Sequence, residues 1–505
     1  MLAERTAPIN FMPLNNLEPF SVWSHFAALC GIPHPSLHEA ALRGHLIEWA
    51  NARGIESIVD AAGNLILKKP GSPGCESMPG VILQGHLDMV CQANTGTKHD
   101  FGRDPIRVAV RDGWVIADNT TLGADNGIGV ALALAALEEP GLIHPPLEVL
   151  LTVNEESGMD GARGLAPGTL RGKTLINLDT EEWGHFYLGC AGGVDVEVCH
   201  DCEQQALPQD YALLRFEVGG LRGGHSGIDI HLGRGNAIKL LAEALRDLAA
   251  HTDIRLIGMQ GGTARNAIPR EAYAEFALPV AAAAGIDEWV QHRHGAWRER
   301  LAAKDAGVSF VCKHYDTPPD TPISHIEQEH LLAFLDTAAN GVSRMSDAFP
   351  GVVDTSSNLG VANLVQGKFS ATFKVRSLHD ARADALADKL ISRAASYALH
   401  AWKVGAYPGW TPNPSSSLLT LCQQAYTAQF GQPASLQVIH AGLECGLLAA
   451  SHPHLDMISF GPDIRGAHAP GERVEIESVA RCWQLLKAVL QALASGIVSS
   501  KYPPA

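Results

Sequence analysis

Several histidines and carboxylates of this chain stand in short clusters whose residue types suit metal chemistry. They are His86, Asp88, Asp125, Glu155, Glu156, Asp179 and His468. Imidazole and carboxylate groups are ligands that favour zinc, with cobalt and manganese as alternatives. One carboxylate can also bridge two ions that lie about 3.5–4 Å apart. The set is large enough to hold two divalent metal ions.

The five candidate ligands divide by the atom that each supplies. His86 and His468 supply nitrogen. Glu156 and Asp179 supply one carboxylate each. Asp125 could be the carboxylate that both ions share.

Asp88 and Glu155 suit supporting roles beside the ligands. Asp88 follows His86 by two residues and could accept the far N–H of its imidazole, which would fix the tautomer. Glu155 adjoins a ligand but would point elsewhere, as a general base that takes a proton from water and later gives it to a leaving group. Each short motif alone is more often a solvated turn, so the prediction depends on their joint occurrence.

The elements expected around these residues explain how they could meet. Apolar runs at 81–85, 147–153, 174–178 and 455–460 are typical of buried strands, and each leads into a candidate ligand. The loop 121–129 places Asp125 just before an apolar helix at 127–139. In open α/β sheets, ligands bind at the carboxyl ends of parallel strands. The candidate ligands are therefore expected at one edge of a sheet.

The wider pattern predicts an α/β protein with a mostly parallel sheet flanked by helices, interrupted by an inserted α+β domain. Strands and helices alternate in 1–193 and again in 405–505, where an amphipathic helix at 477–495 closes the chain. The middle part, 194–404, alternates apolar and polar residues, which is typical of antiparallel strands with one solvated face. We therefore predict three segments, 1–193, 194–404 and 405–505.

Composition excludes several classes of function. The 505 residues carry a net charge of -16, which argues against a nucleic-acid partner and against an anionic membrane surface. No apolar run approaches the roughly 18 residues that span a bilayer, and the N-terminus lacks the apolar segment of a signal peptide. We therefore expect a cytoplasmic protein. Ten scattered cysteines do not form a disulfide pattern, and the pair Cys199 and Cys202 lacks a second pair at zinc-site spacing.

Other catalytic motifs fit poorly. Gly224-His225-Ser226-Gly227 suggests a serine nucleophile, but Ile228 stands where the last glycine of that motif belongs. The sequence around Cys445 indicates neither a helix N-terminus nor a histidine that would stabilise a thiolate. Neither a P-loop nor a dinucleotide-binding glycine pattern is present.

Longer motifs of the chain resemble a known family. GHLDMV (85–90), TLGADNGIG (121–129), TVNEESGMDGARGL (152–165) and INLDTEE (176–182) are similar to the di-zinc exopeptidases that include carnosinases and carboxypeptidases. GCAGG (189–193), LRGGHSGIDIHLGRGNA (221–237), GGTARNAIPRE (261–271) and HAGLECGLL (440–448) resemble more specifically the bacterial aminoacyl-histidine dipeptidases of PepD type. The resemblance runs from about residue 17 to the last helix.

This resemblance assigns roles to the residues. It implies two divalent ions, with zinc as the expected metal and cobalt or manganese as alternatives. The first would be held by His86, Asp125 and Asp179, and the second by Asp125, Glu156 and His468. It implies Glu155 as general base, Asp88 as the acid that orients a histidine, and a cis peptide after Asp125. Arg465-Gly466-Ala467 departs from the usual context before the metal histidine, but His468 and Pro470 match.

The resemblance also implies that the inserted domain is a lid. His225 would stabilise the oxyanion of the tetrahedral intermediate. Asn266 and Arg376 would bind the substrate backbone and its C-terminal carboxylate, for which the fork of an arginine is suited. A homodimer is possible, since in a smaller lid His225 would have to act in a partner chain.

The implied activity is hydrolysis of dipeptides with a C-terminal histidine, carnosine-like compounds included. Two alternatives stay open at this point. The first is a broader di- or tripeptidase, or an N-acyl amino acid deacylase, with the same metal site. The second is a non-catalytic binding protein on the same fold, which the complete set of ligands disfavours.

Overall fold

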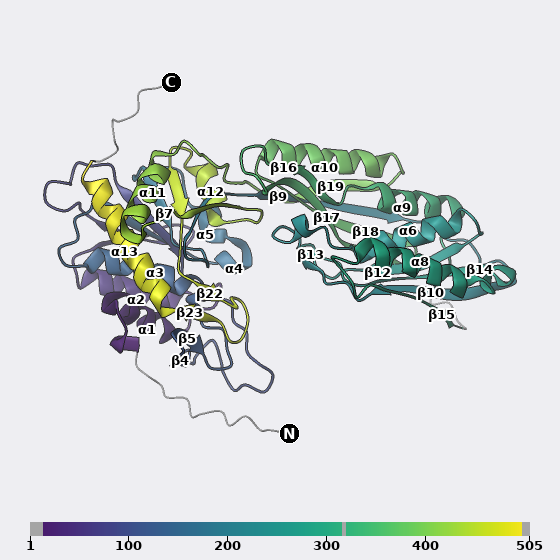
Figure 1. Ribbon diagram of the computed structural model, residues 1–505, viewed down its shortest axis with the longest axis horizontal. Coiled ribbons are helices and arrows are strands. Elements are labelled where there is room, and N and C mark those ends of the chain that lie inside the picture. Colours follow the sequence, from purple (N-terminus) through teal and green to yellow (C-terminus); the bar gives the residue numbers. More distant parts are fainter. Residues whose placement is uncertain (1–13, 316–319, 497–505) are drawn as a thin grey trace. The chain divides into compact units, whose positions relative to one another are not determined.

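The computed structural model describes residues 14–315 and 320–496, which form two compact units (Figure 1). Unit 1 holds the described residues up to 189, with 412–438 and those from 447 on. Unit 2 holds those of 190–411, with 439–446. The sequence had placed 439–446 with the second part of the α/β domain. The segment belongs to unit 2 because Ile439 accepts a backbone hydrogen bond from Ala191 at 3.0 Å and His440 Nε2 lies 2.8 Å from Ser356 Oγ.

Unit 1 is built on an eight-stranded sheet in the order β1-β2-β6-β3-β7-β21-β8-β20. The strands are β1 Glu56–Val59, β2 Leu65–Lys69, β3 Val81–His86, β6 Leu147–Thr152, β7 Thr174–Asn177, β8 His185–Cys190, β20 Ser435–Ile439 and β21 Asp456–Ser459. The central strands β6, β3, β7 and β21 are parallel, whereas β2 and β8 pair antiparallel with them. Every residue of β3 and β6 is buried, as expected of strands covered on both faces. The predicted mostly parallel α/β sheet is confirmed.

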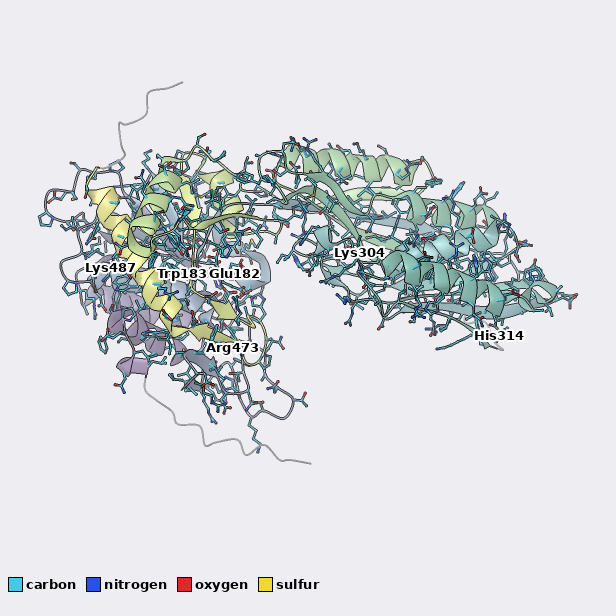
Figure 2. All side chains as sticks on the ribbon, in the orientation of Figure 1. Glu182, Trp183, Lys304, His314, Arg473 and Lys487 are labelled. Atoms are coloured by element: carbon cyan, nitrogen blue, oxygen red, sulfur yellow. The ribbon has the colours of Figure 1, made fainter. Side chains whose placement is uncertain are left out.

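Helices of unit 1 pack on this sheet and on each other. They are α1 Phe20–Cys30, α2 Ala40–Asn51, α3 Ala124–Glu138, α4 Glu155–Gly158, α5 Asp160–Gly164, α11 Ser417–Phe430, α12 Glu444–Ser451, which begins in unit 2, and α13 Ile476–Ala494, with a 3-10 turn η1 at Leu14–Asn16. The Ala-rich α3 is apolar all round and contacts β3, β6, α1 and α13. Lys487 of α13 reaches Glu139 at the end of α3, with 3.4 Å between Nζ and Oε1 (Figure 2).

A second, small sheet in unit 1 was not predicted. It has the order β22-β23-β5-β4, with β4 Val108–Arg111, β5 Trp114–Ala117, β22 Ile464–Arg465 and β23 Arg473–Glu475, all antiparallel. The guanidinium of Arg473 lies 5.3 Å from the ring centre of Trp114. Since β22 and β23 enclose the loop that carries His468, this sheet fixes both ends of that loop.

Unit 2 contains a nine-stranded antiparallel sheet in the order β15-β10-β14-β12-β17-β18-β9-β19, with β16 paired to β17. The strands are β9 Gly192–Asp201, β10 Tyr211–Gly219, β12 Arg255–Gly261, β14 Ala272–Pro279, β15 Ser309–Tyr315, β16 Gly341–Met345, β17 Val353–Val365, β18 Lys368–Ser377 and β19 His400–Tyr407. A two-stranded ribbon pairs β11 Gly224–His225 with β13 Ala267–Ile268. The predicted inserted α+β domain is confirmed.

Helices and aromatic side chains form the core of unit 2. The helices are α6 Ala237–Ala249, α7 Val280–Ala283, α8 Ile286–Leu301, α9 His325–Thr337 and α10 Asp380–Ala395, with a 3-10 turn η2 at Ile230–Leu232. Phe216 lies at the centre of this core, with its ring 4.5 Å from Phe276 and 4.9 Å from Phe310. In the described part of the chain, no helix is long and apolar enough to cross a membrane.

Candidate functional site

The predicted metal ligands meet in unit 1 at the carboxyl ends of the central strands. His86 is the last residue of β3, Glu156 lies in α4 just after β6, and Asp179 follows β7. Asp125 lies in the first turn of α3, and His468 lies in the loop between β22 and β23. The parallel register explains the convergence, because it brings these strand ends to one edge of the sheet.

The ligand atoms form two groups that share Asp125. In the first group, His86 Nε2 lies 3.2 Å from Asp125 Oδ1 and 3.6 Å from Asp179 Oδ1. In the second, His468 Nε2 lies 3.2 Å from Asp125 Oδ2 and 3.0 Å from Glu156 Oε1. The two oxygens of Asp125 therefore face different histidines.

The donor set fits two divalent cations. Within each of the two groups, all ligand atoms lie within 4.8 Å of one another, and a third such group joins His86, Glu155 and Glu156. Glu156 Oε1 is buried and has no well-directed hydrogen bond among the described residues, although it lies 3.0 Å from His468 Nε2. Histidines and carboxylates that converge in this way, with a carboxylate oxygen left for a cation, match the ligands of zinc, cobalt or manganese.

Glu472 holds the loop that presents Asp125. Its buried carboxylate accepts four consecutive backbone N–H groups, those of residues 122–125, at 2.7, 3.0, 2.8 and 3.2 Å. The next peptide bond, between Asp125 and Asn126, is cis, as the family resemblance implies. Glu472 was not among the predicted residues, because a glutamate that follows a glycine in a loop carries no periodic signal.

Asn126 ties the Asp125 loop to the neighbouring strand ends. Its Oδ1 accepts from the backbone N–H of His86 at 3.2 Å, and its Nδ2 donates to the carbonyl of Leu178 at 2.8 Å. Residue 85 must be glycine, because a Cβ there would lie 2.2 Å from Asn126 Oδ1. The sequence suggested only a turn at this asparagine, since its long-range contacts leave no local signal.

Asp88 supports the segment that carries Glu155 more than it supports His86. Its carboxylate accepts the backbone N–H groups of Glu155 at 2.9 Å and of Glu156 at 3.1 Å, and the hydroxyl of Ser36 at 2.7 Å. His86 Nδ1 lies 2.9 Å from the backbone carbonyl of Asp88 and 3.5 Å from its carboxylate. The nearer acceptor for the imidazole is therefore the backbone of Asp88, whereas the sequence had pointed to its side chain.

The loop after Asp179 is anchored on α11 by aromatic contacts. The ring of Trp183, which Figure 2 labels, has its centre 5.4 Å from that of Tyr426 and 5.2 Å from that of Phe430, both in α11. Such edge and tilted ring pairs add stability beyond the area that they bury. They fix the path of the chain just beyond Asp179, a candidate ligand.

The centre is a region of strong negative charge. Burial alone would lower the pKa of His86, but the surrounding carboxylates, Asp179 foremost, raise it well above its usual value. The neighbouring carboxylates of Asp125 and Glu156 raise the pKa of His468 to about 11. Burial opposes ionisation of Asp125, yet the two histidines hold its pKa far below the usual range. Such a field attracts cations.

In unit 2, His225 and Arg376 lie side by side. His225 Nδ1 accepts the backbone N–H groups of Gly227 and Ile228 at 3.2 and 3.0 Å, so the neutral ring carries its proton on Nε2. Burial and the charge of Arg376 lower the pKa of His225 to about 4. Arg376 Nη2 lies 3.4 Å from Nε2, and because both atoms are donors this approach is not a hydrogen bond. Both N–H groups can instead be offered to one oxygen.

Arg376 is held by a chain of contacts within unit 2. It is buried, and its Nη1 donates to the hydroxyl of Tyr407 at 2.8 Å. Lys374 Nζ lies 4.9 Å from the centre of the Tyr407 ring and 2.9 Å from the buried carboxylate of Asp195. Asn266 approaches this group through its backbone, whose carbonyl accepts from the N–H of Ser226 at 2.7 Å, whereas its side chain is exposed.

The sequence matches a family of known proteins over most of its length. The profile of peptidase family M20/M25/M40 matches residues 82–492. The chain belongs to this family. It is 41% identical, over 95% of its length and 99% of the relative, to the cytosol non-specific dipeptidase of Escherichia coli (strain K12).

Two solved structures are similar to this chain over most of its length. The aminoacylhistidine dipeptidase from Vibrio alginolyticus is 40% identical with a TM-score of 0.88, over 95% of this chain and 98% of that one. The aminopeptidase PepT from Bacillus cereus is 16% identical with a TM-score of 0.55, over 95% and 99% of the two chains, and shows likeness of fold alone.

Proposed function

We propose that this protein is a metal-dependent dipeptidase that uses two divalent ions, with zinc as the expected metal and cobalt or manganese as alternatives. The observation that carries the proposal is the pair of ligand groups that share Asp125, with Glu155 close to both His86 and Glu156. Two carboxylate–histidine groups joined by one aspartate are the arrangement in which an attacking and a leaving group can be stabilised together. The two dipeptidase relatives, at 41% and 40% identity, support the same activity.

The proposal gives the chain's residues distinct tasks in the reaction. When bound, the two ions would polarise the scissile carbonyl. They would also lower the pKa of water, so that it can lose a proton and attack that carbonyl. Glu155 takes the proton of the attacking water and passes it to the leaving amine. Asp88 holds the backbone of Glu155, so the base stays at a fixed position.

Residues of unit 2 would recognise the substrate. The Nε2–H of His225 donates to the oxygen that gains negative charge in the reaction. The guanidinium of Arg376 pairs with the C-terminal carboxylate of the dipeptide. Their neighbouring donor atoms and the neutral state of His225 support these roles. Asn266 is proposed to contact the substrate backbone, and its exposed side chain is free to turn towards a ligand.

A preference for C-terminal histidine is the finer part of the proposal. The name of the Vibrio alginolyticus relative supports it, whereas the Escherichia coli relative is named non-specific, which favours a broader dipeptidase. A cytosolic location is proposed from the latter name. The possible homodimer stays a prediction, which light scattering of the purified protein would test.

A substrate panel tests the proposed activity. The protein is treated with chelator, reloaded with zinc, cobalt or manganese, and assayed with Gly-His, Gly-Leu and an acetylated amino acid. We expect chelator-sensitive cleavage of dipeptides, fastest for Gly-His. Equal rates for both dipeptides would contradict the histidine preference. Cleavage of the acetylated amino acid alone would contradict dipeptidase activity and identify a deacylase.

A further inference from the structure

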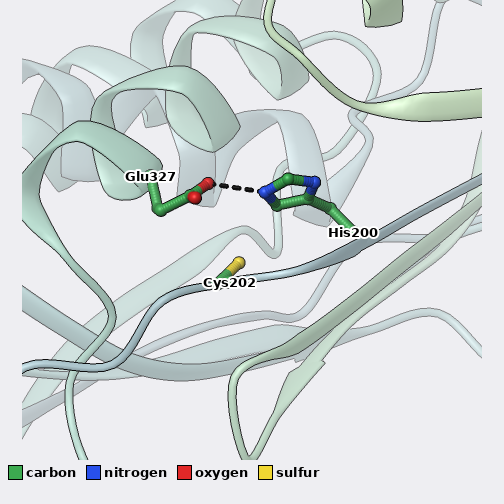
Figure 3. A group of neighbouring side chains, drawn as sticks. All are labelled: His200, Cys202 and Glu327. Atoms are coloured by element: carbon green, nitrogen blue, oxygen red, sulfur yellow. Dashed lines mark ion pairs between the residues drawn. The ribbon is translucent and has the colours of Figure 1, made fainter.

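A second group of metal-ligand types lies in unit 2, away from the five ligands of unit 1 in the sequence and in the fold. It consists of His200, Cys202 and Glu327, which Figure 3 shows pointing towards one another. One ligand atom of each, a ring nitrogen, the sulfur and a carboxylate oxygen, lies within 4.8 Å of the other two. Neither the reaction proposed above nor the family resemblance uses these residues.

The fold places the three side chains together for simple reasons. His200 is the last residue but one of β9, and Cys202 comes directly after the strand, so their two-residue spacing places both on the same face. Val196 and Val198 precede them in this series and belong to the core of unit 2. Helix α9 packs on that core, and Glu327 lies in its first turn, after the N-cap Ser324.

The contact between His200 and Glu327 has an unusual geometry. His200 Nε2 lies 2.7 Å from Glu327 Oε2, and both side chains are about one-fifth exposed. Nε2 is nonetheless a buried atom that has no well-directed hydrogen bond among the described residues. A small opening of this contact, to the roughly 3.3–3.5 Å that separates two ligands of a tetrahedral ion, would let both atoms bind one cation.

Cys202 completes a donor set of sulfur, nitrogen and oxygen. It is partly buried against the core of unit 2. Without a cation, burial and the carboxylates of Glu327 and Asp201 raise the pKa of its thiol to about 12. A divalent cation would reverse the effect of the carboxylates on this pKa, because it neutralises the charge of Glu327 and binds the thiolate directly.

We infer that His200, Cys202 and Glu327 bind a third divalent cation of the zinc type, separate from the peptidase pair. Zinc and cobalt accept a thiolate, an imidazole and a carboxylate together, and water would fill the fourth tetrahedral position. The ion would join the end of β9 to the start of α9. Cys199 is not part of this site, although it forms a C-x-x-C pair with Cys202. It lies on the other face of β9, where its cross-strand neighbours are Ser370 and His400.

Cobalt spectroscopy separates this site from the peptidase centre. The five ligands of unit 1 include no cysteine, so a near-ultraviolet thiolate-to-cobalt charge-transfer band can report only a sulfur ligand. The metal-free full-length protein is titrated with cobalt, and the band is followed. We expect it to appear and to saturate with one ion bound to sulfur. The readout does not depend on peptidase activity, so the two proposals can fail separately.

Variants decide whether the band comes from this group. Cys202→Ser should abolish the band, and Cys199→Ser, the matched control, should keep it. His200→Gln and Glu327→Gln should weaken cobalt binding at the band by roughly a hundredfold, since even the loss of a hydrogen bond to a ligand costs about ten- to a hundredfold. Circular dichroism checks that each variant folds. If Cys202→Ser does not fold, His200→Gln and Glu327→Gln still test the proposal. Absence of the band from the wild type, or its persistence in folded Cys202→Ser, would overturn the inference.

Discussion

Glu472 is the residue on which the position of Asp125 depends most. Its carboxylate is buried and satisfies four backbone N–H groups in succession. Burial raises its pKa, and those hydrogen bonds act in the opposite direction by stabilising the charged form. Glu472 therefore shapes the candidate metal centre without being one of the candidate ligands.

Glu472→Gln should damage both stability and metal binding. The amide presents an NH₂ group to buried N–H donors, so the free energy of unfolding should fall by about 3 kcal/mol or more. Zinc affinity should fall by roughly ten- to a hundredfold, as for other residues that support ligands. Urea unfolding and a zinc-chelator competition measure the two effects. Glu477→Gln, an exposed carboxylate in α13, is the control, and equal behaviour of the two variants would contradict this role.

Tyr407 is expected to act through Arg376. Tyr407→Phe removes the hydroxyl that accepts a hydrogen bond from Arg376 Nη1. Hydrogen bonds to charged groups are among the stronger ones. KM for a dipeptide should therefore rise roughly tenfold, with little change in kcat. Steady-state kinetics separates the two constants. Tyr397→Phe, which changes a tyrosine outside this chain of contacts, should leave both unchanged. A fall in kcat at constant KM would show that Tyr407 does not act by positioning the carboxylate-binding arginine.

At the scale of elements, the start of α6 depends on one asparagine. Asn236 caps the helix, since its Oδ1 accepts from Ile238 and Lys239, and its Nδ2 donates to the carbonyl of Leu359 in β17 at 2.9 Å. The side chain thus joins a helix to the sheet that it covers.

Asn236→Ala should lower the free energy of unfolding of unit 2 by about 2–3 kcal/mol, the sum of a lost cap and an unsatisfied buried carbonyl. Ser324→Ala, which removes the cap of α9, should cost only about 1 kcal/mol. Denaturant unfolding followed by fluorescence measures both. If the two substitutions cost the same, the link to β17 contributes nothing.

The sequence predicted the elements whose signal is local. The strands β3, β6, β7 and β21 were predicted, the first three together with the candidate ligands at or just after their ends, because buried parallel strands appear as continuous apolar runs. The small sheet of β4, β5, β22 and β23 was missed, since its strands have only two to four residues.

In the candidate site too, the residues with a local sequence signal were predicted and those without one were missed. The five candidate ligands could be named from residue type and strand ends, and the structure brings them together. Glu472 and Asn126 could not be named, because their partners lie far away in the chain and each meets backbone atoms, which have no sequence signature. The group of His200, Cys202 and Glu327 was hidden for the same reason, since its acid lies in a distant helix.

At the scale of the whole molecule, buried neutral histidines make stability depend on pH. Burial lowers the pKa of His440 to about 3 and that of His225 to about 4, from 6.5. Between pH 6.5 and about 4, the unfolded chain therefore binds more protons at these two residues than the folded chain does. Their contribution to stability is complete above pH 6.5 and is lost as the pH falls.

The free energy of unfolding should therefore fall between pH 7 and pH 5, and His440→Gln should reduce this dependence. Urea unfolding of both proteins at several pH values, under the same metal conditions, isolates the contribution of His440 from that of other groups. The wild-type curve is expected to be steeper than that of the variant. Parallel curves would mean that His440 is not held neutral in the folded protein.

The central claim is that Glu155 acts as a base beside a two-metal centre, and one variant tests it most directly. Glu155→Gln keeps the shape of the side chain but removes its ability to take a proton. The Cys202→Ser substitution is added to both proteins, because it excludes the proposed third ion. Elemental analysis should then find two zinc ions per chain both with Glu155 in place and in Glu155→Gln. Hydrolysis of Gly-His should fall by about a hundredfold or more in Glu155→Gln. Turnover close to the wild-type rate with both ions bound would contradict the account.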